Sequence, residues 1–237
     1  MQRNLEDNEG DLEQNGERYA HRAPQAGWAE NIPDVVIRRL PLYVRVLETL
    51  RDEEGVHVSS EELGERISIG AAQIRRDLNY FGDFGKQGKG YNVEYLLGQI
   101  KAILQLDRTW NVAIVGVGDL GHALARYSDF NLSGFQIAAL FDHNPDKQGR
   151  RVAGLVIQSM LDLPAILSHE KIEIAVLAVP VGAAQEVADL LVQNGVRAIL
   201  NYAPTVVKVP KHVSIRHIDP IVELQSMSYY LPAPDDV

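Results

Sequence analysis

The sequence NVAIVGVGDLGH, residues 111–122, joins a short β-branched run to a glycine-rich turn and the start of a helical stretch. The turn has the spacing Gly-x-Gly-x-x-Gly and consists of Gly116, Val117, Gly118, Asp119, Leu120 and Gly121. In this context Gly116 allows a tight turn, Gly118 lets a pyrophosphate approach backbone N–H groups, and Gly121 lets helix and strand pack closely. The stretch therefore predicts a dinucleotide-binding site of the Rossmann type.

The residues that follow extend this unit into an α/β fold. Short apolar runs, FQIAALFD, IEIAVLAVP and VRAILN, alternate with helix-like segments, which is typical of βαβ units on a buried parallel sheet. The second run ends at Asp142, 21 residues after Gly121. A carboxylate there accepts hydrogen bonds from ribose hydroxyls and repels a 2′-phosphate, so we expect NAD(H) to be preferred over NADP(H).

The residues before position 107 are mostly helical in pattern and outline a helix-turn-helix. Ser59 and Glu62 form a capping box, a turn is expected over residues 67–70, and a second helix begins at Ala71. Ile74, Leu78 and Phe81 would face the core, while the acidic stretch EELGE, residues 61–65, would face away from phosphates. Further upstream, a helix either starts at Pro41 or kinks there.

A glycine-rich hairpin with two cations is expected next, over GDFGKQGKGYNV, residues 82–93. It follows the helix pair in the order of a winged helix, whose second helix reads the major groove and whose wing lies along the backbone or minor groove. Glutamine can read adenine, and arginine can hold phosphate or guanine. The candidate DNA-binding residues are Ser59, Ser60, Ala71, Gln73, Arg75, Arg76, Lys86 and Lys89.

The charge distribution agrees with this assignment. The 237-residue chain has a net charge of −9, but residues 66–91 hold five basic residues against two acids, a net of +3. Residues 1–31 hold seven acids and three bases with no apolar period, and they are expected to be disordered. There is no cysteine, which excludes thiolate catalysis and zinc sites with sulfur ligands, and the histidine spacing suggests no metal. With no signal peptide or membrane span in the sequence, we expect a cytoplasmic protein.

The sequence resembles the Rex family of bacterial redox-sensing repressors over residues 32–231. The resemblance is carried by RLPLYVRVL (39–47), VSSEELGE (58–65), IRRDLNYFGDFGKQGKGYNVEYLL (74–97), VGVGDLGHAL (115–124), LFDHNPDKQG (140–149), AVLAVP (175–180), ILNYAP (199–204) and HIDPIVELQSMSYYL (217–231). It implies a homodimer without catalytic residues that binds an inverted-repeat operator and releases this double-stranded DNA when NADH binds. It also places the nicotinamide near Val179, Pro180, Asn201, Ala203 and Pro204.

The resemblance further implies an inter-subunit switch formed by Arg45, Tyr127 and Asp219, and a C-terminal helix swapped between subunits. The residues agree with such a helix, because Asp219 is a good N-cap, Pro220 suits the first helical position, and Leu224, Met227 and Leu231 repeat at steps of three and four. The expected organisation is a disordered acidic tail (1–31), a winged-helix domain (32–108), a Rossmann NAD(H)-binding domain (109–218), and a C-terminal helix and tail (219–237).

Two other functions remain open on the sequence alone. One is a small NAD-dependent oxidoreductase with an accessory helical domain, which would turn over NADH with some substrate. The other is a NAD-binding interaction module whose winged helix contacts protein. A sensor differs from the enzyme in binding NADH and leaving it unchanged. No histidine lies in an obvious general-base context, so we expect the sensor.

Overall fold

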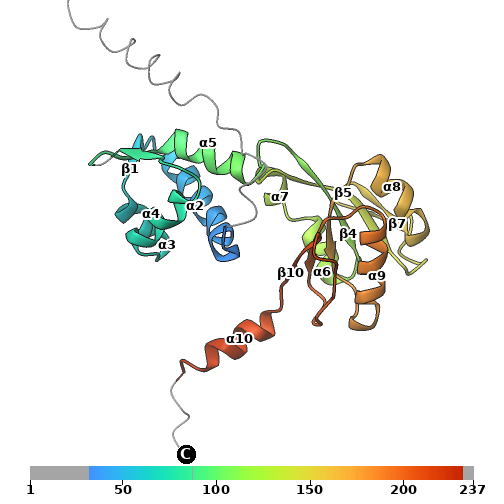
Figure 1. The fold of residues 1–237 in the computed structure, drawn as a ribbon. Coiled ribbons are helices and arrows are strands. Elements are labelled where there is room, and N and C mark those ends of the chain that lie inside the picture. The colour runs from blue at the N-terminus through green and yellow to red at the C-terminus, as the bar shows by residue number, and fades with distance from the viewer. Residues whose placement is uncertain (1–31, 87, 232–237) are drawn as a thin grey trace, which may run out of the picture. The chain divides into compact units, whose positions relative to one another are not determined.

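The N-terminal unit ends at Asp107, and its core is formed around the long helix α2 (Asp34–Asp52). The computed structural model describes residues 32–86 and 88–231, and it divides the chain into this unit and a second one that begins at Arg108 (Figure 1). The expected disordered tail, residues 1–31, and the last residues of the C-terminal tail, 232–237, lie outside the described residues. The other elements of the first unit are β1 (His57–Val58), α3 (Ser60–Ile67), α4 (Ala71–Asn79), β2 (Gly85–Lys86), β3 (Gly90–Asn92) and α5 (Val93–Ile103).

Helix α2 begins at Asp34 and continues through Pro41, so the alternative in which a helix starts at Pro41 is wrong. Proline lacks the N–H that would bond to the carbonyl four residues earlier, which costs helix stability. Burial on both sides of the proline offsets that cost, because Leu40, Tyr43 and Leu47 are all fully buried. Tertiary packing therefore keeps one helix where local sequence rules allowed two interpretations.

The turn between α3 and α4 is tight, and a glycine inside α3 makes it possible. Ser59 caps α3 by accepting a hydrogen bond from the backbone N–H of Glu62 at 3.0 Å, as the capping box predicted. Ser68 ends the helix in the left-handed region, with φ 56°. A Cβ on Gly64 would lie 2.3 Å from the carbonyl oxygen of Ile69, so any larger residue would push the turn apart. Ile74, Leu78 and Phe81 are buried, as expected.

The wing is a small antiparallel sheet with strand order β1-β3-β2. Gly85 pairs with Tyr91 and Lys86 with Gly90, which closes the hairpin over the segment that the sequence marked as glycine-rich. Gly90 has φ +71°, and a Cβ there would lie 2.4 Å from the carbonyl oxygen of Val58, so the hairpin can approach β1 only with glycine at this position.

The C-terminal unit is a seven-stranded sheet with the order β10-β9-β8-β4-β5-β7-β6. Its neighbouring strands are parallel except for β6 and β7. The strands are β4 (Trp110–Val115), β5 (Phe135–Asp142), β6 (Arg151–Val152), β7 (Leu155–Ser159), β8 (Ile174–Leu177), β9 (Ala198–Asn201) and β10 (Ser214–His217); the helices are α6 (Asp119–Ala125), α7 (Asp129–Leu132), the 3₁₀ turn η2 (Met160–Asp162), α8 (Leu163–His169), α9 (Val181–Gln193) and α10 (Pro220–Ser228). The chain leaves β4 toward β5 on one side and returns to β8 on the other, so the strand order reverses beside β4. Ligands bind at such a switch point, outside the carboxyl ends of the strands.

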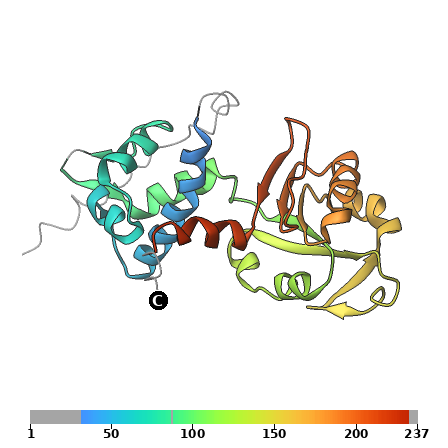
Figure 2. The same cartoon turned by 90° about the horizontal axis from the view of Figure 1, so that it is seen from below.

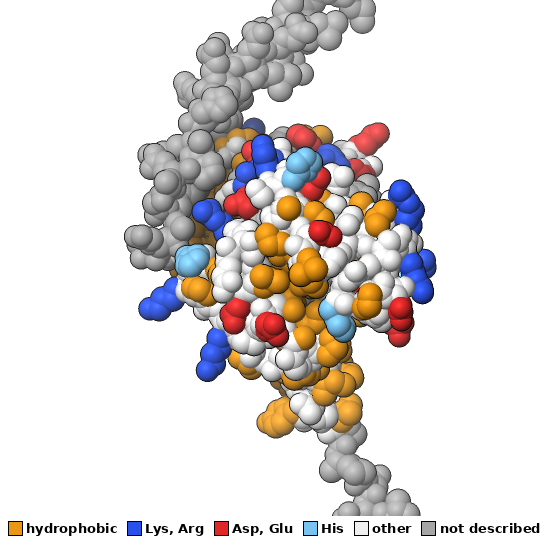
Figure 3. All heavy atoms as spheres, turned by 90° about the vertical axis from the view of Figure 1, so that its right-hand side faces the viewer, with side chains coloured by type: hydrophobic (Ala, Val, Ile, Leu, Met, Phe, Trp, Pro, Cys, Tyr) orange, Lys and Arg blue, Asp and Glu red, His pale blue; other side chains and the backbone are white. Residues whose placement is uncertain are grey.

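Helix α10 ends the described part of the second unit, and none of its residues is buried. Asp219 caps it by accepting a hydrogen bond from the N–H of Ile221 at 3.0 Å, and Pro220 occupies the first turn, as predicted. Figure 2 shows α10 projecting from the sheet rather than covering it, and its apolar side chains gather at the foot of Figure 3. The exposed apolar residues here are Ile221, Val222, Leu224, Met227, Tyr229, Tyr230 and Leu231.

Candidate DNA-binding and dinucleotide-binding sites

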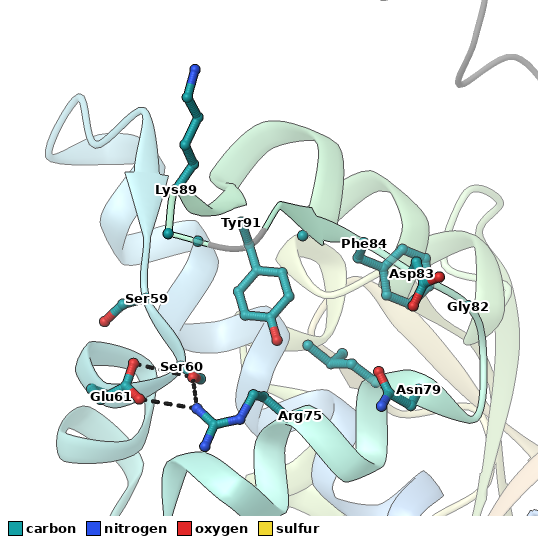
Figure 4. Close-up of a pocket in the computed structure, with 14 residues that line it drawn as sticks. Ser59, Ser60, Glu61, Arg75, Asn79, Gly82, Asp83, Phe84, Lys89 and Tyr91 are labelled. Carbon is teal, nitrogen blue, oxygen red and sulfur yellow. Dashed lines mark hydrogen bonds and ion pairs between the residues drawn. The ribbon is translucent and has the colours of Figure 1, made fainter.

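A pocket of about 650 Å³ opens between the helix-turn-helix and the wing, and it gathers several candidate DNA-binding residues (Figure 4). Ser59 and Ser60 come from the start of α3, Arg75 from α4, and Lys89 from the hairpin. Tyr91 of β3 closes one side, and Figure 4 shows its hydroxyl directed toward the Arg75 side of the pocket. Burial raises the pKa of Tyr91 further above neutrality, and the protonated phenol can donate a hydrogen bond.

Arg75 is held by its neighbours on α3. Its Nη1 donates to the Ser60 hydroxyl at 2.6 Å and to Oε1 of Glu61 at 2.9 Å. The Ser60 hydroxyl in turn donates to Oε2 of Glu61 at 3.1 Å, so the three side chains form a closed ring. Glu61, which belongs to the stretch expected to face away from phosphates, therefore lies beside the candidate DNA-binding residue Arg75. The reason is that the tight turn brings the first turn of α3 beside α4.

A buried carboxylate ties α4 to α2. Asp77 is fully buried and accepts hydrogen bonds from Nε and Nη2 of Arg39 at 2.5 and 2.7 Å, from the hydroxyl of Tyr43 at 2.6 Å, and from Nε2 of Gln73 at 2.7 Å. Burial raises the pKa of Asp77, but the hydrogen bonds from Arg39, Tyr43 and Gln73 outweigh it and leave the pKa below its usual value. Burial, and next the hydrogen bond to Asp77, raises the pKa of the Tyr43 phenol.

The same network occupies Gln73, the residue expected to read adenine. Its Nε2 donates to Asp77, and its Oε1 accepts a hydrogen bond from Nη1 of Arg76 at 3.2 Å. Arg76 and Lys89 are exposed, and Ala71 lies partly exposed at the start of α4. The backbone of Lys86 lies in β2, while its side chain is outside the described part of the chain.

The glycine-rich turn has the geometry that a dinucleotide requires. A Cβ on Gly116 would lie 2.3 Å from the carbonyl oxygen of Ala178, and one on Gly121 would lie 2.0 Å from that of Gly116. These two glycines therefore let the turn, α6 and the neighbouring loop approach each other. A Cβ on Gly118 would meet no protein atom within 4 Å, so this glycine faces open space. That is the side from which a pyrophosphate would approach the N-terminus of α6.

Asp142 is placed at the expected strand end, but its carboxylate also anchors the turn. Oδ2 accepts from the backbone N–H of Val117 at 2.8 Å and from Nζ of Lys147 at 3.0 Å, and Oδ1 accepts from the N–H of Asn144 at 2.9 Å. Its exposed fraction is 3%. Burial raises the pKa of Asp142, but the hydrogen bonds from Asn144, Lys147 and Val117 outweigh it, and the pKa is lowered. The sequence pattern did not indicate this anchoring function.

The remaining candidate residues lie at the carboxyl ends of β8 and β9. Val179 and Pro180 follow β8, and Pro180 occupies the position just before α9. Asn201 is fully buried, and its amide hydrogen-bonds with the backbone of Ala203 and Thr205 and with Nδ1 of His217. Asn201 thus holds the loop that carries Ala203 and Pro204.

The three candidate switch residues are divided between the units. Arg45 is exposed on α2. Tyr127 is 56% exposed and stacks edge to face on Phe130, with ring centroids 5.7 Å apart. Asp219 caps α10. Arg45 therefore lies in the N-terminal unit, and Tyr127 and Asp219 lie in the C-terminal unit.

Comparisons with known proteins found matches to both units of the chain. Residues 31–79 match a family model described as "Putative DNA-binding protein N-terminus", and residues 107–205 match one described as "CoA binding domain". A Rex repressor from Roseiflexus sp. (strain RS-1) is 56% identical over 202 residues, covering 85% of this chain and 92% of that protein. RSP, a Rex-family repressor, has been solved with beta-NAD+ and operator DNA; that structure is 41% identical, has a TM-score of 0.80, and the match covers 84% of this chain and 91% of that one. RSP has also been solved with beta-NADH; there the identity is 39%, the TM-score is 0.76, and the match covers 84% of this chain and 93% of that one.

The fold and sites define a two-domain nucleotide-sensing DNA-binding protein, with a winged helix joined to a Rossmann-type domain. The chain belongs to the Rex family of redox-sensing transcriptional repressors. Because its relatives are named repressors and not enzymes, the oxidoreductase alternative is set aside. Across residues 32–86 and 88–231, no helix is long and apolar enough to cross a membrane, and no three His, Cys, Asp or Glu residues cluster as metal ligands would.

Proposed function

We propose that this chain is a homodimeric repressor that binds an inverted-repeat operator through its winged helix and releases it when NADH binds to the Rossmann domain. The observation that carries the proposal is the presence in one chain of a helix-turn-helix with Arg75 and Arg76 on its second helix and of a complete dinucleotide turn. RSP, which shares both units, has been solved with NAD+ and operator DNA and with NADH. We further propose that the protein acts in the cytoplasm.

The proposed nucleotide site consists of residues 116–121 and Asp142, with the loops after β8 and β9 beside them. Backbone N–H groups at the start of α6 would hold the pyrophosphate, since Gly118 leaves that side open. The segments at Val179–Pro180 and Ala203–Pro204 would contact the nicotinamide. The "CoA binding domain" match makes coenzyme A a second ligand worth testing at the same turn.

The proposed homodimer would use α10, whose apolar residues have no cover within the described chain. A swapped α10 would bury them against the second subunit. Arg45 and Asp219 can form a bidentate ion pair in one arrangement of the subunits, and the Tyr127 hydroxyl can compete for the same carboxylate in the other. The operator would then be released because recognition helices must match half-sites about 34–36 Å apart.

Reciprocal binding tests this proposal. If NADH weakens operator binding by a factor of about 100, operator DNA must weaken NADH binding by the same factor, equal to about 2.7 kcal/mol of coupling free energy. We expect NADH to show this coupling, and NAD+ and coenzyme A to show less. Fluorescence titration of NADH with and without a duplex selected by the wild-type protein measures it. Equal NADH affinities in the two titrations would contradict a NADH-gated repressor.

The switch residues have their own expected result in that assay. Asp219→Ala should reduce the coupling more than it reduces NADH binding to the free protein, because Asp219 lies outside the proposed nucleotide site. Glu223→Ala, one turn further along α10, is the matched control and should leave the coupling unchanged. A parallel loss in both variants would assign the effect to α10 as a helix and not to the Asp219 carboxylate.

The contribution of the proposed DNA-binding residues can be measured from the salt dependence of operator binding. Replacing Arg75 and Arg76 together with alanine should weaken binding and lower the slope of log affinity against log salt by about 0.9 for each lost phosphate contact. Because Arg75 is already paired with Glu61, we expect most of the change in slope to come from Arg76. Fluorescence anisotropy across a salt series checks both statements, and an unchanged slope in the double variant would contradict the assignment of α4 to DNA.

A further inference from the structure

We propose that Glu61 is a positioning residue for operator recognition: together with Ser60, it orients the guanidinium of Arg75 so that one edge faces the bases. The inference rests on the proposed DNA-binding function. It adds Glu61, a residue that the sequence analysis expected to face away from phosphates. Glu61 lies on α3 and Arg75 on α4, so the contact joins the two helices of the helix-turn-helix.

The ring of hydrogen bonds gives Arg75 one defined orientation. Nη1 is used twice, by Ser60 and by Glu61, at 2.6 and 2.9 Å, and Ser60 is itself buried. Figure 4 shows the other terminal nitrogen pointing away from Glu61 and Ser60. Among the residues that the structure describes, Nε and Nη2 of Arg75 make no hydrogen bond, so the edge that they form is available. Two parallel N–H groups are what bidentate recognition of guanine O6 and N7 requires.

The charges indicate that this arginine reads bases rather than anchoring phosphate. A carboxylate 2.9 Å from the guanidinium offsets its charge and repels a phosphate that approaches the same place. A residue whose only use was to attract the DNA backbone would be weakened by this neighbour. A base-reading arginine benefits, because its long side chain is fixed before DNA arrives and loses less conformational freedom on binding.

The test compares specific and non-specific binding in the full-length protein. For Glu61→Ala we expect affinity for a selected inverted-repeat duplex to fall about three- to tenfold. This is less than the full discrimination between bases that one bidentate contact supplies, because Arg75 itself is still present. Affinity for a scrambled duplex of the same length should rise, because a negative charge near phosphates is removed. Glu61→Gln keeps an acceptor for Arg75 and should retain more of the operator preference.

Glu62→Ala is the matched control, since it removes the same charge one residue away and the carboxylate of Glu62 contacts Arg66 on its own helix. It should raise binding to both duplexes. In an Arg75→Lys background, Glu61→Ala should no longer reduce operator preference, because lysine lacks the planar fork. If Glu61→Ala strengthens binding to both duplexes, Glu61 only screens Arg75 and the inference is overturned. If the wild type prefers neither duplex, the proposed DNA-binding function fails instead.

Discussion

Arg39→Met should lower the free energy of unfolding of the N-terminal unit by about 3 kcal/mol, near the lower end of the range for a broken buried ion pair. The substitution leaves the Asp77 carboxylate fully buried, with only Tyr43 and Gln73 to compensate it. We use the lower end of that energy range because the Arg39 side chain is 19% exposed to solvent, so the ion pair is only partly shielded from water. Urea unfolding followed by far-ultraviolet circular dichroism, with hydrogen exchange of α4 amides, measures the change.

Arg38→Met is the matched control, because Arg38 pairs with Asp34 on the exposed surface of the same helix. An exposed pair at this spacing contributes about 0.3–0.5 kcal/mol. Equal losses in the two variants would contradict a special function for the buried network. Adding Asp77→Asn to Arg39→Met should recover part of the loss, because the uncompensated charge is then gone.

The same network has a defined pH dependence. The folded-state pKa of Asp77 lies below the unfolded value of about 3.9, so its contribution to stability is present above that pH. It is lost as the pH falls through the folded-state pKa. The difference in unfolding free energy between wild type and Arg39→Met should therefore be constant near neutral pH and shrink below about pH 4.

Asp142→Ala should weaken NADH binding by about 10- to 100-fold, since the carboxylate is proposed to bind the ribose and also holds the glycine-rich turn. The variant loses the hydrogen bonds to the N–H groups of Val117 and Asn144 and leaves Lys147 without its carboxylate. Because the turn serves any dinucleotide, we expect NADPH binding to weaken as well. The preference for NADH should narrow, because the negative charge that repels a 2′-phosphate is gone.

Calorimetry with NADH and NADPH separates these effects, and Asp146→Ala is the control. Asp146 lies in the same loop with an exposed side chain, so its loss removes the same charge and leaves the turn intact. We expect it to change neither affinity by more than about twofold, as for most exposed substitutions. If the wild type binds NADH and NADPH equally, Asp142 does not set the preference.

The sequence predicted well those features that depend on residues adjacent in the chain. The strand, turn and helix around residues 111–122 follow each other directly, and the close approach of Gly121 to Gly116 lies within the same stretch. The caps at Ser59 and Asp219 are likewise local, and the structure has both. The hairpin over residues 82–93 was indicated by its glycines, because positive φ angles and close backbone approach favour that residue.

The features that were missed depend on contacts between distant residues. A charged residue on a helix is normally expected to face solvent. The burial of Asp77 and its ion pair with Arg39, 38 residues earlier, were therefore not predicted. Glu61 and Arg75 are 14 residues apart, and only the geometry of the turn brings them together. Gly64 was missed for another reason: its neighbour Ile69 is close in sequence, but the contact between them forms only once the tight turn has bent the chain back.

The position of β4 at the centre of the parallel sheet has a consequence for synthesis of the chain on the ribosome. The N-terminal unit is complete at residue 107, and α2 packs on α5 within it, so the unit can fold as soon as it emerges. Strand β4 then pairs with β5, but its other edge stays unpaired until β8 is synthesised, about 60 residues later. During that interval an apolar strand edge is open to other nascent chains. We expect slow translation to favour aggregation of this protein through β4 while its DNA-binding unit is already folded.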